Sequence, residues 1–302
     1  MEVYTPITVP DAFVPADYGL LTAVNWVTPT NGNWAVGVSY EANCTATNIT
    51  VDPCIISGSP TVPEKAATWD RSERGSRPFT VLARADCAPV DDWLTTGREK
   101  VLKSLSDNSQ YALERTLWTG YAFGTSALIF PNLTTVGPIT DASGRIVLQP
   151  ASSLVAGGPY DVVEGLNRLE AQIVACGYTG NGVIHVPVAV SNALVAQHLV
   201  YDRGGKLYTK TGHQVVIGRG YDTTISPSGP AVTGQAWMMA TSPIFGIRGT
   251  PKTFDPMQSF DRSVNTLEFM AEQTFLLGWT CCRAGVLVST GGEPAGLPNT
   301  ST

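Results

Sequence analysis

The residue types of this chain that could carry chemistry occur without the spacing that the chemistry needs. A serine nucleophile on a G-x-S-x-G elbow lies between two glycines, but the segment GTSAL (124–128) has only the first of them. A phosphate-binding loop needs G-x-x-x-x-G-K-[ST], whereas leucine follows the lysine in DRGGKL (202–207). The GRG run (218–220) is too short for a dinucleotide-binding fingerprint. We therefore predict neither a hydrolase nor a nucleotide-binding site.

The three histidines, His185, His198 and His213, are predicted to be structural. No two of them stand at the spacing of a metal-ligand pair. They fall within a predicted strand, on a predicted helix and beside a predicted hairpin turn. The paired carboxylates Asp91 and Asp92 fit the first turn of a helix, where negative charge is favourable. The sequence thus predicts no catalytic residue, no metal site and no cofactor.

The composition of the 302-residue chain favours contacts between copies of it. Hydrophobic residues make up 43% and charged residues 15% of the sequence, and the charged share is low against the ~25% usual in soluble domains. Apolar surface must then be covered in the core or by other subunits. The net charge is −6 and there is no dense Lys/Arg run, which argues against specific nucleic-acid binding.

Neither a signal peptide nor a membrane-spanning helix is predicted. The N-terminal stretch MEVYTPITVPDAF has no cationic start and is interrupted by prolines and an acid. The apolar run 265–282 contains Glu268 and Glu272, whereas a spanning helix needs about 20 nearly uninterrupted apolar residues. We expect no membrane partner.

The six cysteines include no C-x-x-C pair and are predicted to be reduced, mostly buried thiols. Cys44 and Cys54 flank a loop and form the pair that later oxidation could join. Cys281 and Cys282 are expected on opposite faces of a strand, which argues against joint metal binding.

The first part of the chain predicts an arm and a long loop. Residues 1–32 are punctuated by prolines and acids and read as an extended arm. Strands are predicted at 34–41 and 79–87, paired as a hairpin around the polar stretch 42–77. An unstructured stretch of this length is uncommon in a compact domain unless it has a function.

Two helices carry clear signals. The first spans about 89–120 and is either continuous or broken near Gly97 or Ser106–Ser109. The second begins at Asp161, which forms with Glu164 the pattern of a capping box. The apolar stripe of the first helix is Leu94, Val101, Leu105, Ala112 and Leu117.

The rest of the chain mixes strands and helices without a βαβ rhythm and predicts an α+β fold. Strands are expected at 183–186, on both sides of a turn at Thr211–Gly212, and as a pair within 236–249. The stretch 265–282 is expected to be extended, with a bend near Gly278. Its apolar positions at period two are Leu267, Phe269, Ala271 and Phe275.

Six charged residues in and beside the polar stretch are the candidate interaction site: Lys65, Asp70, Arg71, Glu73, Arg74 and Arg77. One interpretation is a solvated loop. The other is a loop that lies on a neighbouring copy and pairs with its charges, because mixed signs suit self-association better than polyanion binding. Both interpretations stay open at this point.

The order of these parts resembles the HK97-fold major capsid proteins of tailed bacteriophages. Four stretches look like the corresponding ones in capsid proteins of phages that infect actinobacteria: NWAVGVSYEANC, LERTLWTG, GVIHVPVAV with GHQVVIGRGYD, and FDPMQSFDRSVNTLEFMAEQTFLLGW. The resemblance covers most of the chain and rests on packing and turn patterns.

The resemblance implies five parts. They are an N-terminal arm (1–32), an extended loop or E-loop (33–88), a P-domain with a long spine helix (89–150), a compact A-domain (151–240), and a return to the long P-domain strands (241–302). The alternative is that the last strand belongs to the A-domain. Arm and loop would reach over neighbouring subunits, and the P-domain strands would place their apolar face on the spine helix.

The function implied is a shell subunit that assembles in the host cytoplasm into pentamers and hexamers of a virion and encloses double-stranded DNA without gripping it. A portal protein would be a partner. A separate scaffolding protein is expected too, since the arm starts almost at Met1. The alternatives are an encapsulin-type cargo compartment, and a cytosolic enzyme or binding protein with a pocket in 151–240 near His185 and His213.

Overall fold

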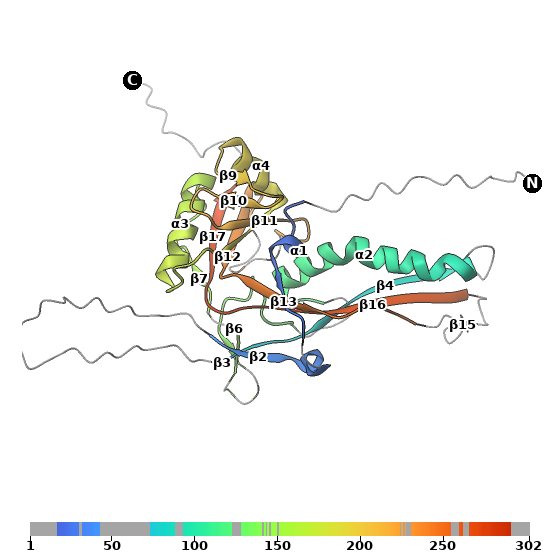
Figure 1. Ribbon diagram of the computed structural model, residues 1–302. Coiled ribbons are helices and arrows are strands. Elements are labelled where there is room, and N and C mark those ends of the chain that lie inside the picture. Colours follow the sequence, from blue (N-terminus) through green and yellow to red (C-terminus); the bar gives the residue numbers. More distant parts are fainter. Residues whose placement is uncertain are drawn as a thin grey trace, which may run out of the picture.

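The computed structural model of the chain describes residues 17–29, 32–42, 73–87, 93–122, 128–140, 146–149, 151–223, 231–254, 260–261 and 266–290, with positions 142, 144, 225 and 227. Three sheets organise these residues. A long sheet lies along one long helix, a compact sheet carries two further helices, and a small sheet lies beside the long one (Figure 1).

The long sheet contains β1 (Asn25–Trp26), β4 (Phe79–Cys87), β13 (Ile244–Arg248), β14 (Lys252–Thr253), β15 (Phe260–Asp261) and β16 (Thr266–Trp279). The compact sheet has the order β7 (Ser153–Leu154), β17 (Arg283–Ser289), β12 (Gln235–Thr241), β8 (Val183–Pro187), β11 (Gln214–Gly218), β10 (Leu207–Thr209), β9 (Val200–Asp202). The small sheet has the order β2 (Val38–Glu41), β3 (Glu73–Ser76), β6 (Val147–Gln149), β5 (Ile139–Thr140). The helices are α1 (Leu20–Ala23), the 3-10 helix η1 (Gly32–Val36), α2 (Trp93–Thr119), α3 (Val162–Ala175) and α4 (Val188–Ala196).

β16 is the central strand of the long sheet. It pairs antiparallel with β4 from Leu267 to Phe275 and with β13 from Phe275 to Trp279. The predicted period of two is confirmed, because Leu267, Phe269, Ala271 and Phe275 are all buried. The predicted bend near Gly278 is found two residues further on, at Thr280 and Cys281, because the pairing with β13 carries the strand through Gly278 to Trp279.

The long helix α2 is one unbroken element of 27 residues, which decides between the two predicted forms. Its buried side chains repeat every fourth residue at Val101, Leu105, Leu113 and Leu117. Gly97 lets the helix approach the sheet, because a Cβ there would lie 2.7 Å from the ring of Phe269. The helix therefore covers one face of β4 and β16 along its length (Figure 1).

The compact sheet is covered on both faces. The helices α3 and α4 pack on one of them, and alternate residues of β8, Ile184 and Val186, belong to that cluster. Val183 belongs to the cluster on the opposite face. All five residues of β8 are buried, as expected for a strand between two layers.

The predicted cap of α3 is confirmed in one of its two halves. The Asp161 carboxylate accepts the backbone N–H groups of Val163 and Glu164 at 2.8 and 3.1 Å. The Glu164 carboxylate instead pairs with Arg168 one turn further on, at 2.7 Å. Gly177 follows the helix with a φ of 87°, the left-handed conformation of a C′ glycine.

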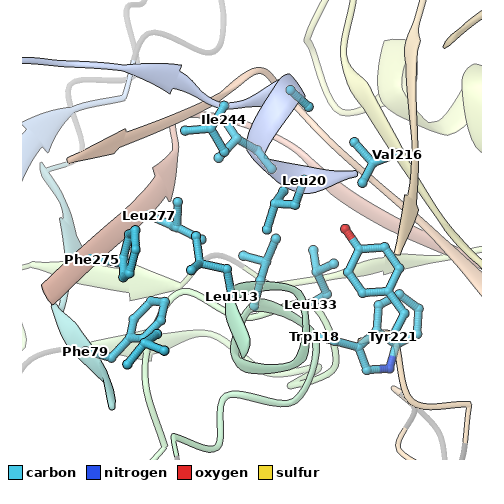
Figure 2. Packing of buried hydrophobic residues seen from close by; sticks show 14 of the residues in the cluster. Leu20, Phe79, Leu113, Trp118, Leu133, Val216, Tyr221, Ile244, Phe275 and Leu277 are labelled. Atoms are coloured by element: carbon cyan, nitrogen blue, oxygen red, sulfur yellow. The ribbon is translucent and has the colours of Figure 1, made fainter. Parts of the chain in front are cut away.

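A single large core joins the long and compact sheets. In Figure 2, Leu113 of α2 and Leu133 lie between Phe275 of the long sheet and Tyr221 beside the compact sheet. Trp118 stacks on Tyr221 with ring centroids 4.8 Å apart, and its indole N–H donates to the carbonyl of Asp222 at 2.7 Å. The two sheets are thus parts of one packed body.

Two predicted strand pairings are wrong. Strand β2 begins only at Val38, because Gly32–Val36 form a 3-10 helix, and it pairs with β3 instead of β4. Between β3 and β4, the backbone N–H of Arg77 donates to the carbonyl of Phe130. The next residue, Pro78, has no backbone N–H, so neither residue donates a backbone hydrogen bond to β2. β12 and β13 likewise do not pair with each other: β12 lies in the compact sheet and β13 in the long one.

The cysteine prediction also needs correction. The chain folds so that the C-cap of α3, Cys176, meets Cys282 in the connection between β16 and β17, and the two form a disulfide with Cα atoms 6.0 Å apart. Cys281 and Cys282 lie in that connection and not on a strand. A contact between residues 106 apart in sequence leaves no trace in local spacing. Cys44 and Cys54 lie outside the described residues.

Candidate assembly surfaces

The six predicted contact residues divide into two groups. Lys65, Asp70 and Arg71 lie outside the described residues. Glu73 and Arg74 lie on β3, where they stand opposite Glu41 and Tyr40 of β2. Arg77 follows β3 and is exposed. The structure therefore places the second group at the root of the long loop, and the proposal that these residues contact another subunit stays a prediction.

The root of this loop is held firmly. The hydroxyl of Tyr40 donates to the carbonyl of Trp279 at 3.0 Å, and its ring meets Phe245 edge-on with centroids 4.8 Å apart. The backbone N–H of Arg77 donates to the carbonyl of Phe130 at 2.9 Å. Whatever the loop contacts, its two ends start from a fixed platform on the long sheet.

The face of the long sheet that points away from α2 is polar and open in the described structure. Arg84 on β4 bridges Asp86 on its own strand at 3.2 Å and Glu268 on β16 at 2.8 Å. Leu82 belongs to the same face and is 46% exposed. Solvent screens such exposed pairs, so they contribute little to the stability of the fold and indicate instead what kind of surface this face can contact.

A cavity of about 410 Å³ opens between β4 and the C-terminal half of α2. Its lining combines Thr80, Val81 and Leu82 of β4 with Tyr111, Ala112, Arg115 and Thr116 of α2, and it ends at Tyr121 and Ala122. Tyr111 is 50% exposed. Aromatic and Arg side chains on an open apolar surface are typical of protein interfaces.

The helix α4 exposes an apolar stripe. Val188 and Val195 stand seven residues apart on one face of the helix and are 49% and 55% exposed. The opposite face, with Val190 and Leu194, is buried against the compact sheet. A helix that is apolar on both faces is usually covered on both, so this stripe is a candidate subunit contact.

Two of the three histidines, His185 and His213, have the structural roles that the sequence predicted. His185 is fully buried, with Nδ1 2.8 Å from the Tyr221 hydroxyl and Nε2 3.1 Å from the Thr241 hydroxyl, and burial lowers its pKa to about 3. His213 is buried too, its pKa is lowered by burial, and its Nδ1 accepts the N–H of Gly182 at 2.8 Å. His198 follows α4 instead of lying within it, with a φ of 54°. Neutral, hydrogen-bonded imidazoles of this kind hold the compact sheet together.

Among the described residues, no group of three His, Cys, Asp or Glu side chains could hold a metal ion. None of the helices that the structure describes combines the length and the apolar character needed to cross a membrane.

One buried carboxylate ties three parts of the chain together, and the sequence did not reveal it. Glu114 of α2 accepts the backbone N–H of Leu20 at 3.1 Å and that of Gly220 at 3.0 Å, and the side-chain amide of Gln110 at 3.2 Å. Burial raises its pKa above the usual range, and the hydrogen bonds oppose that rise. Its position between Leu113 and Leu117 on the buried stripe was the available signal.

A buried arginine holds the region between the sheets. Arg283, the first residue of β17, donates through Nη1 to the carbonyl of Asn132 at 2.7 Å and through Nη2 to that of Val136 at 3.4 Å. Burial lowers its pKa to about 9. Gln149 secures the same segment by accepting the N–H of Asn132 and donating to the carbonyl of Thr135, both at 2.7 Å.

Solved structures resemble the chain along nearly its whole length, although no protein-family model and no curated protein matches it. The capsid of an empty GTA particle computed with C5 symmetry has a TM-score of 0.55 at 11% identity, covering 96% of this chain and 95% of that one. A structure from Mycobacterium phage Bobi gives 0.53 at 14% identity, with 96% of each chain covered. The holo-SrpI encapsulin complex from Synechococcus elongatus gives 0.51 at 10% identity, covering 95% and 92%.

These alignments define the class of fold. Identities of 10–14% with matches that run from end to end show a shared backbone arrangement. The chain therefore has the α+β, HK97-like capsid fold that the sequence resemblance implied.

Proposed function

We propose that the chain is the major capsid protein of a tailed bacteriophage, a non-enzymatic subunit that assembles into pentamers and hexamers of an icosahedral shell around double-stranded DNA. The observation that carries the proposal is the end-to-end match to shell subunits of three kinds of particle, with at least 95% of this chain aligned. A fold by itself does not imply a function, so the surfaces supply the second argument.

The open surfaces support an assembled state. Leu82 of β4, which lies on the polar face and also lines the cavity beside α2, is half-exposed, and so are Val188 and Val195 on a separate element, α4. A subunit inside a shell has several neighbours and needs several separate contact surfaces, whereas a monomer gains nothing from exposed apolar residues.

The proposal keeps the five parts that the sequence resemblance implied, and it assigns the last strand to the A-domain. The spine helix is α2, and the P-domain is built on α2 and β16, with β4 at the end of the E-loop range paired to β16. The compact A-domain is built on the seven-stranded sheet and includes the last strand, because β17 pairs with β12 along its whole length. Residues 1–32 would be the arm and 33–88 the E-loop, with Lys65, Asp70, Arg71, Glu73, Arg74 and Arg77 as contacts to a neighbouring subunit.

The charge of the chain suits a container for DNA. A wall that neutralised many phosphates with Lys and Arg would bind the genome tightly, and the net charge of −6 avoids this. In this function the subunit assembles in the host cytoplasm with a separate scaffolding protein and a portal protein, and ends in the virion.

An encapsulin-type cargo compartment is the second candidate, because the encapsulin structure aligns almost as well as the capsids do. The two candidates differ in what the assembled particle would contain. Native particles that hold double-stranded DNA support the capsid, and particles that hold an enzyme and no genome support the compartment. The enzyme alternative loses support from His185, whose two ring nitrogens are both occupied by buried hydroxyl partners.

The direct test is electron microscopy of the full chain, purified from its native source and after expression with a candidate scaffolding protein. We expect closed polyhedral particles. A stable monomer of about 32 kDa from both sources, with no particles, would contradict a shell function.

A loop variant tests how the shell would be held together. Residues 45–70 are replaced by a short Gly-Ser linker, which spares β3, whereas a deletion of 44–77 would also remove its pairing with β2 and β6. We expect a folded subunit with a normal melting temperature and few particles.

A matched Val195→Asp variant, with Val232→Asp as control at another exposed valine, tests the stripe of α4 in the same assay. Normal particle yields from all three variants would remove the loop and α4 from the proposed interface.

A further inference from the structure

The connection between the long and compact sheets is built from two chain segments that lie side by side. Ser242, between β12 and β13, donates its backbone N–H to the carbonyl of Cys282 at 3.1 Å. Its hydroxyl accepts the backbone N–H of Cys281, also at 3.1 Å. Both segments carry the chain from one sheet to the other, so together they form the joint of the molecule.

The disulfide between Cys176 and Cys282 is attached to this joint. Cys176 ends α3, which belongs to the compact sheet, and Cys282 lies in the second crossing segment. The small cluster around the pair includes Ala42, the last described residue before the long loop, and Tyr178. One covalent bond therefore links the end of α3 to the second crossing segment, next to Ala42.

We propose that Cys176 and Cys282 form a redox-controlled lock on the joint between the two sheets, open as two thiols in a reducing compartment and closed as a disulfide in an oxidising one. Thiols stay reduced in the cytosol, and the shell function proposed above includes assembly in the host cytoplasm. If the chain serves the shell function proposed above, it would assemble with the lock open and close it after release.

The burial of the three nearby thiols sets the order of the reaction. Cys176 is half-buried, whereas Cys282 and Cys281 are both buried. A small-molecule disulfide, such as oxidised glutathione, therefore meets Cys176 first: the Cys176 thiolate attacks one of its sulfurs and releases one small thiol. The Cys282 thiolate then attacks the Cys176 sulfur of this mixed disulfide and releases the second small thiol.

The electrons balance within this exchange. Two protein thiols are oxidised to one disulfide, one small-molecule disulfide is reduced to two thiols, and the two protons pass to the released thiols. Cys281 stays a thiol in the structure, with its Sγ 3.3 Å from the hydroxyl of Thr280. It serves as the internal control, since it is adjacent to the reacting residue and buried to a similar degree.

The test combines thiol mapping with thermal unfolding of the full-length chain. The protein is alkylated during lysis to record its state in the cell, and a second sample is equilibrated with oxidised and reduced glutathione before peptide mapping. We expect Cys176 and Cys282 to be alkylated in the first sample and joined in the second, with Cys281 unpaired in both. Closing a loop of 106 residues should raise the melting temperature by about 5–10 °C, and a reductant should reverse the shift.

Three variants make the result specific. Cys176→Ser and Cys282→Ser should each abolish the redox-dependent shift, and Cys281→Ser should keep it in full. The lock is overturned if Cys176 and Cys282 stay alkylatable in oxidised glutathione, if Cys281 is the residue that pairs, or if Cys176→Ser keeps the shift. Particle formation is scored separately by electron microscopy, so a chain that forms no shells but shows the exchange would contradict the proposed function and leave the lock intact.

Discussion

The compact sheet and the long sheet bury their strands in different ways. The compact sheet has α3 and α4 on one face and the common core on the other, so that every residue of β8 is buried. The long sheet has α2 on one face only, and its other face carries Arg84, Glu268 and the half-exposed Leu82. The compact sheet has both of its faces covered within the chain, whereas the long sheet leaves part of one face and a cavity open to something outside the chain.

The difference separates the residues that stabilise the fold from the exposed residues that are free to contact another molecule. Residues shared by both regions, such as Leu113, Trp118 and Tyr221, decide whether the chain folds. Residues on the open face contribute little to stability and are therefore available for association. Substitutions on the buried side of α2 should therefore destabilise the fold, and substitutions on its exposed side should not.

The largest effect is expected in the core under α2. Leu105→Asp places an unpaired charge on the buried stripe, and we expect a loss of about 4–5 kcal/mol or more in unfolding free energy, with insoluble protein. Ser104→Asp, on the exposed side of the same turn, should stay within about 0.5 kcal/mol of the parent. Soluble yield and urea unfolding measure both. Equal tolerance of the two variants would show that α2 is not packed as described.

A smaller effect is expected where the two regions meet. Glu114→Ala leaves the backbone N–H groups of Leu20 and Gly220 buried without acceptors, which should cost about 2–4 kcal/mol. Glu114→Gln keeps one acceptor oxygen and should lose about half as much. Urea unfolding of both variants measures the loss. If alanine proves no worse than glutamine, the carboxylate is not the tie that joins the regions.

An acid-dependent effect is expected in the compact sheet. His185 has a folded-state pKa of about 3, below its ordinary value of 6.5, so its contribution to stability is complete above about pH 6.5. As the pH falls below 6.5 towards 3, the unfolded chain takes up a proton that the folded chain refuses, and stability falls by up to about 1.4 kcal/mol per pH unit. Urea unfolding from pH 7 to pH 4 should show a flatter profile for His185→Gln. Parallel profiles would mean that other groups set the acid sensitivity.

The smallest effect on stability is expected on the open face of the long sheet. Arg84→Ala removes exposed contacts to Asp86 and Glu268 and should leave the unfolding free energy close to that of the parent. Thermal unfolding of the isolated subunit measures the difference. Particle yield, scored on the same sample, sharpens the comparison: a clear fall in yield with an unchanged subunit would mean that a neighbour covers this face.

The sequence predicted the elements whose signals are local. The long helix, the Asp161 cap and the alternating burial of Leu267, Phe269 and Ala271 all follow from spacing within one segment. The α+β class followed from the order of these elements. The fold itself came from the resemblance of whole stretches, a signal that spacing alone does not contain.

The sequence did not predict how distant segments pair. β3 joins β2 instead of β4, β12 and β13 separate into two sheets, and Cys176 meets Cys282, all through long-range contacts. The candidate surfaces were predicted only in part. Glu73, Arg74 and Arg77 were found as charges in a polar stretch, whereas the stripe of α4 is visible only once its other face is known to be buried.

The two adjacent segments at Ser242 and Cys282 have a mechanical consequence. A force that pulls the compact unit away from the long sheet is shared by two short tethers that run in parallel and are hydrogen-bonded to each other. Paired tethers resist torsion as well as stretching, while a single linker would swivel. If the chain forms the proposed shell, this double tether and the common core would together limit how far the two units tilt against each other.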